Sequence, residues 1–488
     1  MNPNWIIFIL ASVGLIVVGE ITRRIVERTQ TSSGEGFLLA AKQVGAFVGA
    51  GTLMATGFSG WGFIGSPGAT YAYGTIEIFA NYFYAPAITF GVLLFANYMR
   101  KQAAKHGGLT IPHYLASTHR GTSNQKRLVH FFAGLATFVF LSVYMIGQIR
   151  AVGLIASEWL GISQLAGSLI LLAVVVIFTM QGGLLAVAVT DTIMCMGMLI
   201  ASIVVYVVII RDIPMGQLLS KVAQMNPEFI NPSTADPYGV GKFNAWLVFP
   251  YALLFTTVLP YMSVRFLSLK DDIKIHVMAL ITAPYGLLLS LPPFVGLYMY
   301  YKNPNLPIAD SAMPLFLKDF LHPAIGGMIM LFILFAMLST VSSVLQSLAS
   351  ALSYDMFVSI ANRESKYASL LNRLAVLVTT IWTLILTFFA PQGMITHIAY
   401  IGTGGLISAF VAPTIMRVFI EADLRTCFVS MLVGFFGNVI LAIWSNFGWV
   451  QIPLIAGAAG CIVYVIMGYV TNGGVRKPEQ LEASGGLS

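Results

Sequence analysis

Apolar runs of roughly 20 residues recur from one end of the chain to the other, and each is long enough to cross about 30 Å of hydrocarbon. Of the 488 residues, 57% are hydrophobic and 9% are charged, whereas a soluble domain carries about 25% charged residues. The sequence therefore predicts an all-α polytopic membrane protein set in a lipid bilayer, since a β-barrel would show short alternating segments. The net charge of +7 fits basic cytoplasmic loops, so nucleic acid is not an expected partner.

We expect about thirteen transmembrane helices. The apolar segments that predict them are residues 5–20, 45–70, 73–98, 128–157, 164–181, 184–210, 243–264, 273–300, 326–352, 367–390, 395–418, 426–448 and 452–470. With the N-terminus outside and the C-terminus in the cytoplasm, most of the 26 Lys and Arg residues fall on the cytoplasmic side, where such residues are enriched.

The predicted domain organisation is a single transmembrane domain over residues 1–470, followed by a cytoplasmic tail over residues 471–488. We divide the transmembrane domain into four parts, which are an extra N-terminal span at 5–20, five spans at 45–210, five spans at 243–418 and two C-terminal spans at 426–470.

Two of the predicted spans contain helix-breaking residues. The segment "GAGTLMATGFSGWGFIGSPGATYAYG", residues 49–74, overlaps the predicted span 45–70 and contains many glycines. The glycines indicate either close helix packing or a discontinuous helix whose freed carbonyls face a cavity. The segment at 243–264 contains Pro250 and Pro260, and each proline removes a backbone donor. The two spans lie five apart, as expected for an inverted repeat of five helices with a binding site between the interrupted spans.

Other spans carry polar side chains. Asp191 lies inside the span at 184–210, where a carboxylate is costly and should have a partner. Either neighbouring hydrogen-bond donors satisfy it, or it belongs to a cation site or a relay. Tyr144 and Gln148 are one turn apart and share a helix face. Arg150, on a different side of that helix, either meets a substrate carboxylate or extends to the outer interface.

Hydroxyl side chains cluster in the span at 326–352. Ser339, Thr340 and Ser343 follow Ala336 at helical spacing and line one stripe with it, and Ser342 lies beside them. Such residues can simply pack helices closely and bond back to their own backbone. Alternatively, the cluster supplies hydroxyl oxygens to Na⁺, which transporters bind with hydroxyls and unwound carbonyls.

The segment "AMLSTVSSVLQSLASALSYDMF" resembles the signature helix of the sodium/solute symporter family. The segments "GFSGWGFIGSPGATYAYG", "GGLLAVAVTDTIM" and "LPYMSVRFLSLKDD" are similar to the first, fifth and sixth core helices of that family, especially in its sodium/pantothenate and sodium/proline members. The resemblance covers nearly the whole chain. It implies a leucine-transporter-type fold with a 5+5 inverted repeat and discontinuous helices, in the bacterial inner membrane.

The resemblance also implies binding residues. The common sodium site would consist of the carbonyls of Ala55, Phe58 and Ala336 and the hydroxyls of Ser339 and Thr340, and a possible second sodium site of Asp191, Ser339, Ser342 and Ser343. One or two Na⁺ are thus expected as coupling ions. The substrate-binding candidates are Ser59, Trp61, Asn81, Tyr144, Gln148, Thr256 and Thr257.

The function implied is sodium-coupled symport of a small polar organic solute by alternating access, and not an enzymatic reaction. The solute could be an organic anion such as a monocarboxylate, a pantothenate-like compound or an amino acid. Departures from the proline-transporter pattern, such as Gly57 in place of an acidic residue, leave the substrate open. A proton-coupled carrier of the same fold and a non-transporting solute sensor are the alternatives. A functional monomer is plausible from the sequence, which does not fix the oligomeric state.

Overall fold

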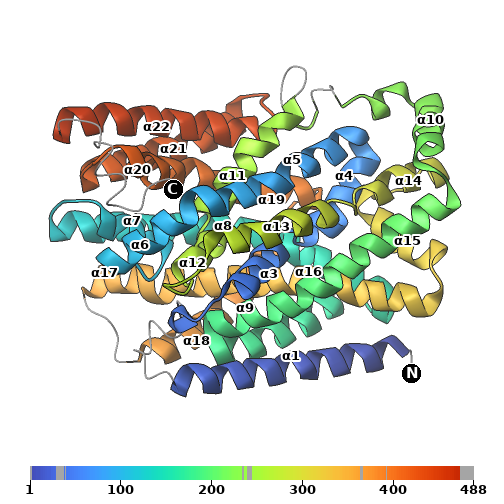
Figure 1. Cartoon of the computed structure of the whole chain (residues 1–488), viewed down its shortest axis with the longest axis horizontal. Coiled ribbons are helices and arrows are strands. Elements are labelled where there is room, and N and C mark those ends of the chain that lie inside the picture. Colours follow the sequence, from blue (N-terminus) through green and yellow to red (C-terminus); the bar gives the residue numbers. More distant parts are fainter. Residues whose placement is uncertain are drawn as a thin grey trace.

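The computed structural model describes residues 3–28, 38, 40–232, 236–238, 244–362, 367–391 and 393–472. These residues are mostly helical, and most of the helices run side by side along the long axis of the molecule (Figure 1). The α-helices are α1 (Pro3–Arg28), α3 (Ala46–Gly57), α4 (Ser66–Tyr73), α5 (Thr75–Gly91), α6 (Asn97–His106), α7 (Ile111–Thr118), α8 (Ser123–Leu160), α9 (Gln164–Asp212), α10 (Met215–Met225), α11 (Val248–Val258), α12 (Pro260–Leu267), α13 (Ile275–Leu289), α14 (Phe294–Lys302), α15 (Ala312–Phe320), α16 (Pro323–Ser350), α17 (Phe357–Ala361), α18 (Ala368–Phe389), α19 (Ile395–Val411), α20 (Arg417–Phe419), α21 (Leu424–Trp444) and α22 (Gln451–Asn472).

Ten helices in the described part of the chain are long and apolar enough to cross a membrane, or eleven if the bent pair α11 and α12 counts as one span. The expected number of about thirteen is therefore not confirmed. The difference has a physical cause, because interruptions of the helices divide predicted spans into pieces too short to cross a membrane, such as α3 and the segment Gln164–Met180. The predicted tail lies almost wholly outside the described residues, since residues 473–488 are not among them.

Glycine and proline mark the breaks. The helical segments of α9 are joined at Gly183, whose φ of 57° and ψ of −148° lie outside the helical region and are readily adopted only by glycine. The axes of α11 and α12 differ by 57° across Leu259, which has an extended conformation and precedes Pro260, as the clash between a proline ring and the preceding residue requires.

The helices differ in how deeply they are buried. In the most apolar 18-residue stretch of α16 and its continuation to Ala361, 83% of the residues are buried, and the corresponding share for α19 is 89%. The share is only 28% for α1, α18 and α22, so these three helices lie at the periphery. The hydroxyl-rich helix α16 is therefore central, and its polar side chains face protein rather than lipid, which is where such groups are tolerated.

The contact between α21 and α19 depends on a glycine. A Cβ atom on Gly434 would lie 1.8 Å from the carbonyl oxygen of Ser408, so Gly434→Ala is expected to separate the two helices and lower the midpoint of thermal unfolding. Gly437→Ala is the matched control in the same helix, because a Cβ there would lie 3.4 Å from the Cβ of Ala456, an ordinary contact. Equal midpoints for the two variants would contradict this packing.

Candidate functional site

The first broken helix ends at Gly57. Phe58 has φ −92° and ψ 68°, outside the helical region, and the chain resumes as a π-helical turn at Trp61–Gly65 that leads into α4. The absence of a side chain on Gly60 permits close approach of α8, because a Cβ there would lie 3.1 Å from Oε1 of Gln148. The predicted discontinuity in this span is therefore present, and it lies in the protein interior, where interrupted backbone is tolerated.

Hydroxyl groups of α16 lie directly against the end of α3. Oγ of Ser339 donates to the carbonyl oxygen of Ala55 at 3.0 Å and to that of Ala336 at 3.0 Å. Oγ1 of Thr340 donates to the carbonyl of Thr56 at 3.1 Å and to that of Ala336 at 3.3 Å. Both hydroxyl residues are fully buried. The carbonyl of Thr56, which the sequence analysis did not include, belongs to this oxygen cluster.

The five residues predicted for the common sodium site are thus mostly adjacent. Ala55, Ala336, Ser339 and Thr340 are joined by the hydrogen bonds just described, and Phe58 is the first residue of the break. Uncharged hydroxyl and carbonyl oxygens from a broken helix and a neighbouring helix are the donors that transporters use for Na⁺. The donor set therefore fits a hard monovalent cation, while the coordination of Na⁺ by these residues stays a prediction.

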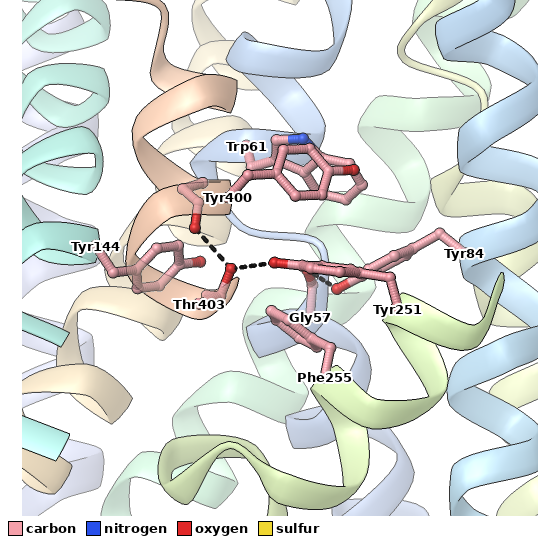
Figure 2. Close-up of a pocket in the computed structure, with 9 residues that line it drawn as sticks. Gly57, Trp61, Tyr84, Tyr144, Tyr251, Phe255, Tyr400 and Thr403 are labelled. Atoms are coloured by element: carbon pink, nitrogen blue, oxygen red, sulfur yellow. Dashed lines mark hydrogen bonds between the residues drawn. The ribbon is translucent and has the colours of Figure 1, made fainter. Parts of the chain in front are cut away.

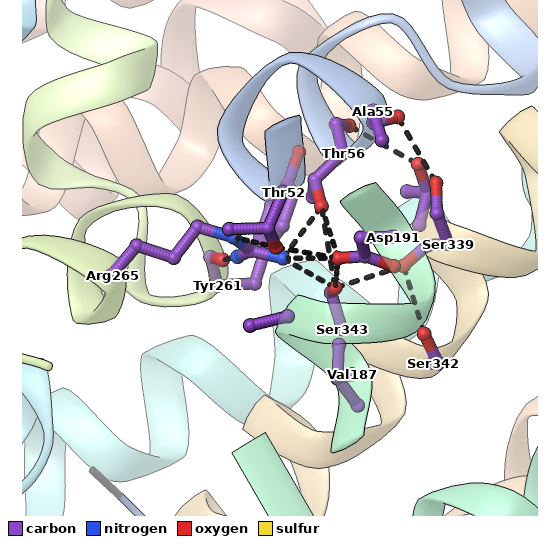
Figure 3. A network of polar contacts seen from close by, with 12 residues as sticks. Thr52, Ala55, Thr56, Val187, Asp191, Tyr261, Arg265, Ser339, Ser342 and Ser343 are labelled. Carbon is purple, nitrogen blue, oxygen red and sulfur yellow. Dashed lines mark hydrogen bonds and ion pairs between the residues drawn. The ribbon is translucent and has the colours of Figure 1, made fainter. Parts of the chain in front are cut away.

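Asp191 is the centre of a second polar network (Figure 3). Its Oδ2 accepts hydrogen bonds from Thr52 at 2.7 Å and Thr56 at 3.2 Å, and it lies 3.0 Å from Nη2 of Arg265. The guanidinium also donates to Thr52 at 2.8 Å, Thr56 at 2.6 Å and Ser343 at 2.7 Å. Both charged side chains are almost completely buried, so each charge compensates the other.

In this network the carboxylate predicted to bind a second Na⁺ is already bound by Arg265. Oγ of Ser343 lies 3.5 Å from Oδ2 of Asp191, whereas the hydroxyl groups of Ser342 and Ser343 both donate to the carbonyl of Ser339. Arg265 was not predicted as a site residue, because the basic residues were expected mostly on the cytoplasmic side. Its position just after the break in the α11–α12 span was the available signal, because a charge beside an interrupted helix can reach the interior.

A cavity lies beside the break in α3 (Figure 2). Most of its wall is aromatic, and the residues that line it are Gly57, Trp61, Tyr84, Tyr144, Tyr251, Phe255, Ala399, Tyr400 and Thr403. Its volume of about 20 Å³ is enough for roughly one water molecule. Tyr251 and Phe255, one turn apart on α11 and therefore on one face, were not predicted; their i, i+4 spacing was the signal.

Several predicted substrate-binding residues meet at this cavity. Trp61 and Tyr144 line it, and the hydroxyl of Tyr144 donates to Oγ of Ser59 at 3.2 Å. Nε2 of Gln148 lies 3.5 Å from the same oxygen. Ser59 thus connects two residues of α8 to the break in α3.

The other predicted substrate-binding residues lie elsewhere. Nδ2 of Asn81 donates to Oγ of Ser66 at 2.6 Å and to Oε1 of Glu77 at 3.0 Å, in a buried cluster apart from the cavity lining. The hydroxyls of Thr256 and Thr257 bond back to carbonyls one turn earlier in α11. Neither threonine lines the cavity, because the opposite face of α11 presents its two aromatic residues there.

Arg150 binds the end of a neighbouring helix. Its guanidinium donates to the carbonyl oxygens of Ala390 at 2.7 Å and Pro391 at 2.9 Å, just after α18 ends. Cations are favoured at helix C-termini, where carbonyl groups lack partners. Of the two interpretations of Arg150, this arrangement favours the peripheral one, because its guanidinium is directed toward a helix end.

Interrupted helices that meet around a central cavity beside a cluster of hydroxyl and carbonyl oxygens define an ion-coupled secondary transporter. The chain belongs to the sodium:solute symporter family, whose family model matches residues 37–434. The protein is accordingly a sodium-coupled solute symporter and not an enzyme, and its relatives are bacterial membrane transporters.

Curated relatives agree with this assignment. The chain is 26% identical over 443 residues to a high-affinity proline transporter of Bacillus subtilis, covering 86% of this chain and 88% of the relative. It is 25% identical over 431 residues to sodium/proline symporter 2 of Staphylococcus saprophyticus, covering 84% and 80%. It is 24% identical over 427 residues to the sodium/pantothenate symporter of Haemophilus influenzae, covering 85% and 86%.

Solved structures establish the fold. The structure of a Na⁺-coupled sialic acid symporter in a substrate-bound outward-open state superposes with a TM-score of 0.76 at 15% identity, covering 97% of this chain and 98% of that chain. A nucleobase-cation-symport-1 family transporter superposes with a TM-score of 0.53 at 14% identity, covering 88% and 93%. The fold is therefore that of leucine-transporter-type carriers.

Proposed function

We propose that the protein imports a small polar organic solute by alternating access, driven by the sodium gradient. The solute would be an amino acid, a pantothenate-like compound or an organic anion such as a monocarboxylate, and the relatives named for proline and pantothenate make the first two the leading classes. The observation that carries the proposal is the contact between the hydroxyls of α16 and the carbonyls at the broken end of α3, beside the central cavity.

In this proposal, Na⁺ binds between α3 and α16. Its ligands are the carbonyls of Ala55, Phe58 and Ala336 and the hydroxyls of Ser339 and Thr340. The ion favours one arrangement of the two helices, and the solute then binds in the adjoining cavity. Ion and solute can each shift the conformational equilibrium only through different affinities for its states, and their coupling is reciprocal. The membrane potential contributes about 2.3 kcal/mol per charge per 100 mV.

A second Na⁺ at Asp191, Ser339, Ser342 and Ser343 would have to share the carboxylate with Arg265. Oδ2 of Asp191 is bound by the guanidinium at 3.0 Å, whereas its Oδ1 has no hydrogen-bond partner within the described part of the chain. We therefore propose that a second ion approaches through Oδ1. The ratio of Na⁺ flux to solute flux gives the number of ions per transport cycle, and a Hill coefficient of uptake above one would require at least two.

We further propose about thirteen spans arranged as a 5+5 inverted repeat plus flanking helices, with the N-terminus outside and the C-terminus in the cytoplasm. The protein would act as a monomer in the bacterial inner membrane. Cysteine accessibility at each terminus would establish the orientation, because a membrane-impermeant reagent labels only the side that it reaches.

The function is tested by uptake into liposomes that contain the purified protein. Accumulation of a solute from a panel of proline, pantothenate, short monocarboxylates, sialic acid and sugars is expected only with an inward Na⁺ gradient. Accumulation driven by a pH gradient without Na⁺ would indicate the proton-coupled alternative. Solute binding without any accumulation would indicate the sensor, and either result would overturn the proposal.

A further inference from the structure

The wall of the cavity is a cage of aromatic rings (Figure 2). The ring centroids of Trp61 and Tyr84 lie 4.8 Å apart, those of Tyr251 and Tyr400 lie 5.0 Å apart, and Phe255 is 5.7 Å from Tyr84. None of the residues lining the cavity carries a formal charge, within the part of the chain that the structure describes. A solute that enters must therefore gain its affinity from ring faces and a few polar atoms.

Ring faces carry the negative part of the aromatic quadrupole, so they attract cations, and cages of several rings recognise alkylated ammonium groups. A carboxylate alone would meet the same faces unfavourably. The cage therefore selects for a positively charged group on the solute.

Several hydrogen-bond acceptors of the cage already have partners, which indicates the kind of cation. The carbonyl of Gly57 accepts from the hydroxyl of Tyr84 at 3.0 Å. The hydroxyls of Tyr251 and Thr403 lie 2.5 Å apart, and the latter donates to the carbonyl of Ala399 at 2.6 Å. A primary ammonium brings three N–H donors that each need an acceptor when buried, whereas a quaternary ammonium brings none.

One donor at the cage has no partner. Nε1 of Trp61 is buried and makes no hydrogen bond to any residue that the structure describes, so it can serve a carboxylate oxygen. Further positive charge would come from the proposed sodium site, since Ala55 is only two residues before Gly57, which lines the cavity. A negative group on the solute would thus have an unpartnered N–H at Trp61 and the positive charge of the bound ion to interact with.

We infer that the solute is a compact zwitterion that combines an alkylated ammonium group with a carboxylate, as in the betaines. This inference rests on the proposed function, because it concerns the solute of the same transport cycle. In the structure the rings contact one another and leave only about 20 Å³. The alkylated ammonium enters by separating these rings, and its contacts with the ring faces replace the contacts between rings.

The test compares two isosteric solutes on the full-length protein in liposomes with Na⁺. Glycine betaine carries a trimethylammonium group, and 3,3-dimethylbutanoate has the same shape with carbon in place of the charged nitrogen. We expect glycine betaine to inhibit Na⁺-driven uptake of the solute identified in the liposome panel at least tenfold more strongly than 3,3-dimethylbutanoate does. Proline is expected to lie between them. Equal competition by the two isosteres, or preference for the carbon isostere, would overturn the inference.

Variants of one ring locate the effect. Tyr251→Leu removes a ring face and is expected to abolish most of the preference for glycine betaine over its isostere, whereas Tyr251→Phe keeps the face and the preference. Phe249→Leu is the control on the same helix, since Phe249 packs against Phe90 and does not line the cavity. A preference that survives Tyr251→Leu undiminished would contradict the assignment to this cage.

The outcomes also separate this inference from the proposed function. Sodium-driven accumulation of pantothenate, a sugar or a monocarboxylate, with no competition by either ammonium zwitterion, would refute the cage and leave the symporter intact. Loss of all sodium dependence would instead refute the proposed function, whichever solute binds.

Discussion

An Arg265→Ala variant is expected to lose about 3–5 kcal/mol of its free energy of unfolding, because it leaves a buried carboxylate without its positive partner. The guanidinium lies 3.0 Å from Oδ2 of Asp191, and the exposed fractions of the two side chains are 1% and 0%. Thermal unfolding in detergent measures the loss. Sodium chloride, compared with potassium chloride at equal ionic strength, is expected to restore part of the stability, since Na⁺ can then occupy the vacated side of the carboxylate.

The double variant Asp191→Asn with Arg265→Gln is the matched control. It removes both charges while keeping hydrogen-bonding groups of similar size, so it is expected to recover most of the stability that Arg265→Ala loses. A single variant as stable as the parent protein would show that the pair is not a buried charge compensation. A double variant as unstable as the single variant would point to packing by the arginine side chain instead.

The variants Ser339→Ala and Thr340→Val are each expected to raise the Na⁺ concentration for half-maximal uptake about tenfold or more. An interaction with a charged group contributes about 1.5–3 kcal/mol, and about 1.4 kcal/mol corresponds to a factor of ten in affinity. Valine keeps the shape of threonine while removing its hydroxyl, so a change in Thr340→Val reports the loss of an oxygen. Initial uptake rates over a series of Na⁺ concentrations provide the measurement.

Ser350→Ala is the control for both variants. Ser350 belongs to the same helix, and its hydroxyl donates to the carbonyl of Gln346 at 2.7 Å, so its removal is expected to leave the Na⁺ dependence unchanged. The sodium assignment fails if Ser339→Ala and Thr340→Val behave like this control.

The sequence predicted the class of fold and the location of the broken helices because both depend on local composition. Long apolar runs define spans, and glycine or proline inside such a run marks an interruption. The break after Gly57 and the bend at Leu259 are where these residues indicated. The number of spans was less predictable, because a break can divide one apolar run into pieces of unknown length.

The site residues show the same limit. Ser339 and Thr340 were selected because their own helix concentrates hydroxyl groups. Arg265, by contrast, meets Ser343 only in three dimensions, and Tyr400 reaches the cavity wall from a helix distant in the sequence. Thr256 was selected for its polar side chain, yet its hydroxyl bonds to its own helix. Which face of a helix points to the centre of the protein depends on packing against all of its neighbours. That packing cannot be deduced from a single sequence.

The bend at Leu259 joins two helices that carry different parts of the site. Before the bend, α11 supplies Tyr251 and Phe255 to the cavity wall, and after it α12 carries Arg265 to Asp191. A swing of α12 relative to α11 would pull the guanidinium from the carboxylate and expose both charges to an unfavourable interior. Such a swing would therefore carry an electrostatic penalty, and a cation beside the carboxylate would offset part of it.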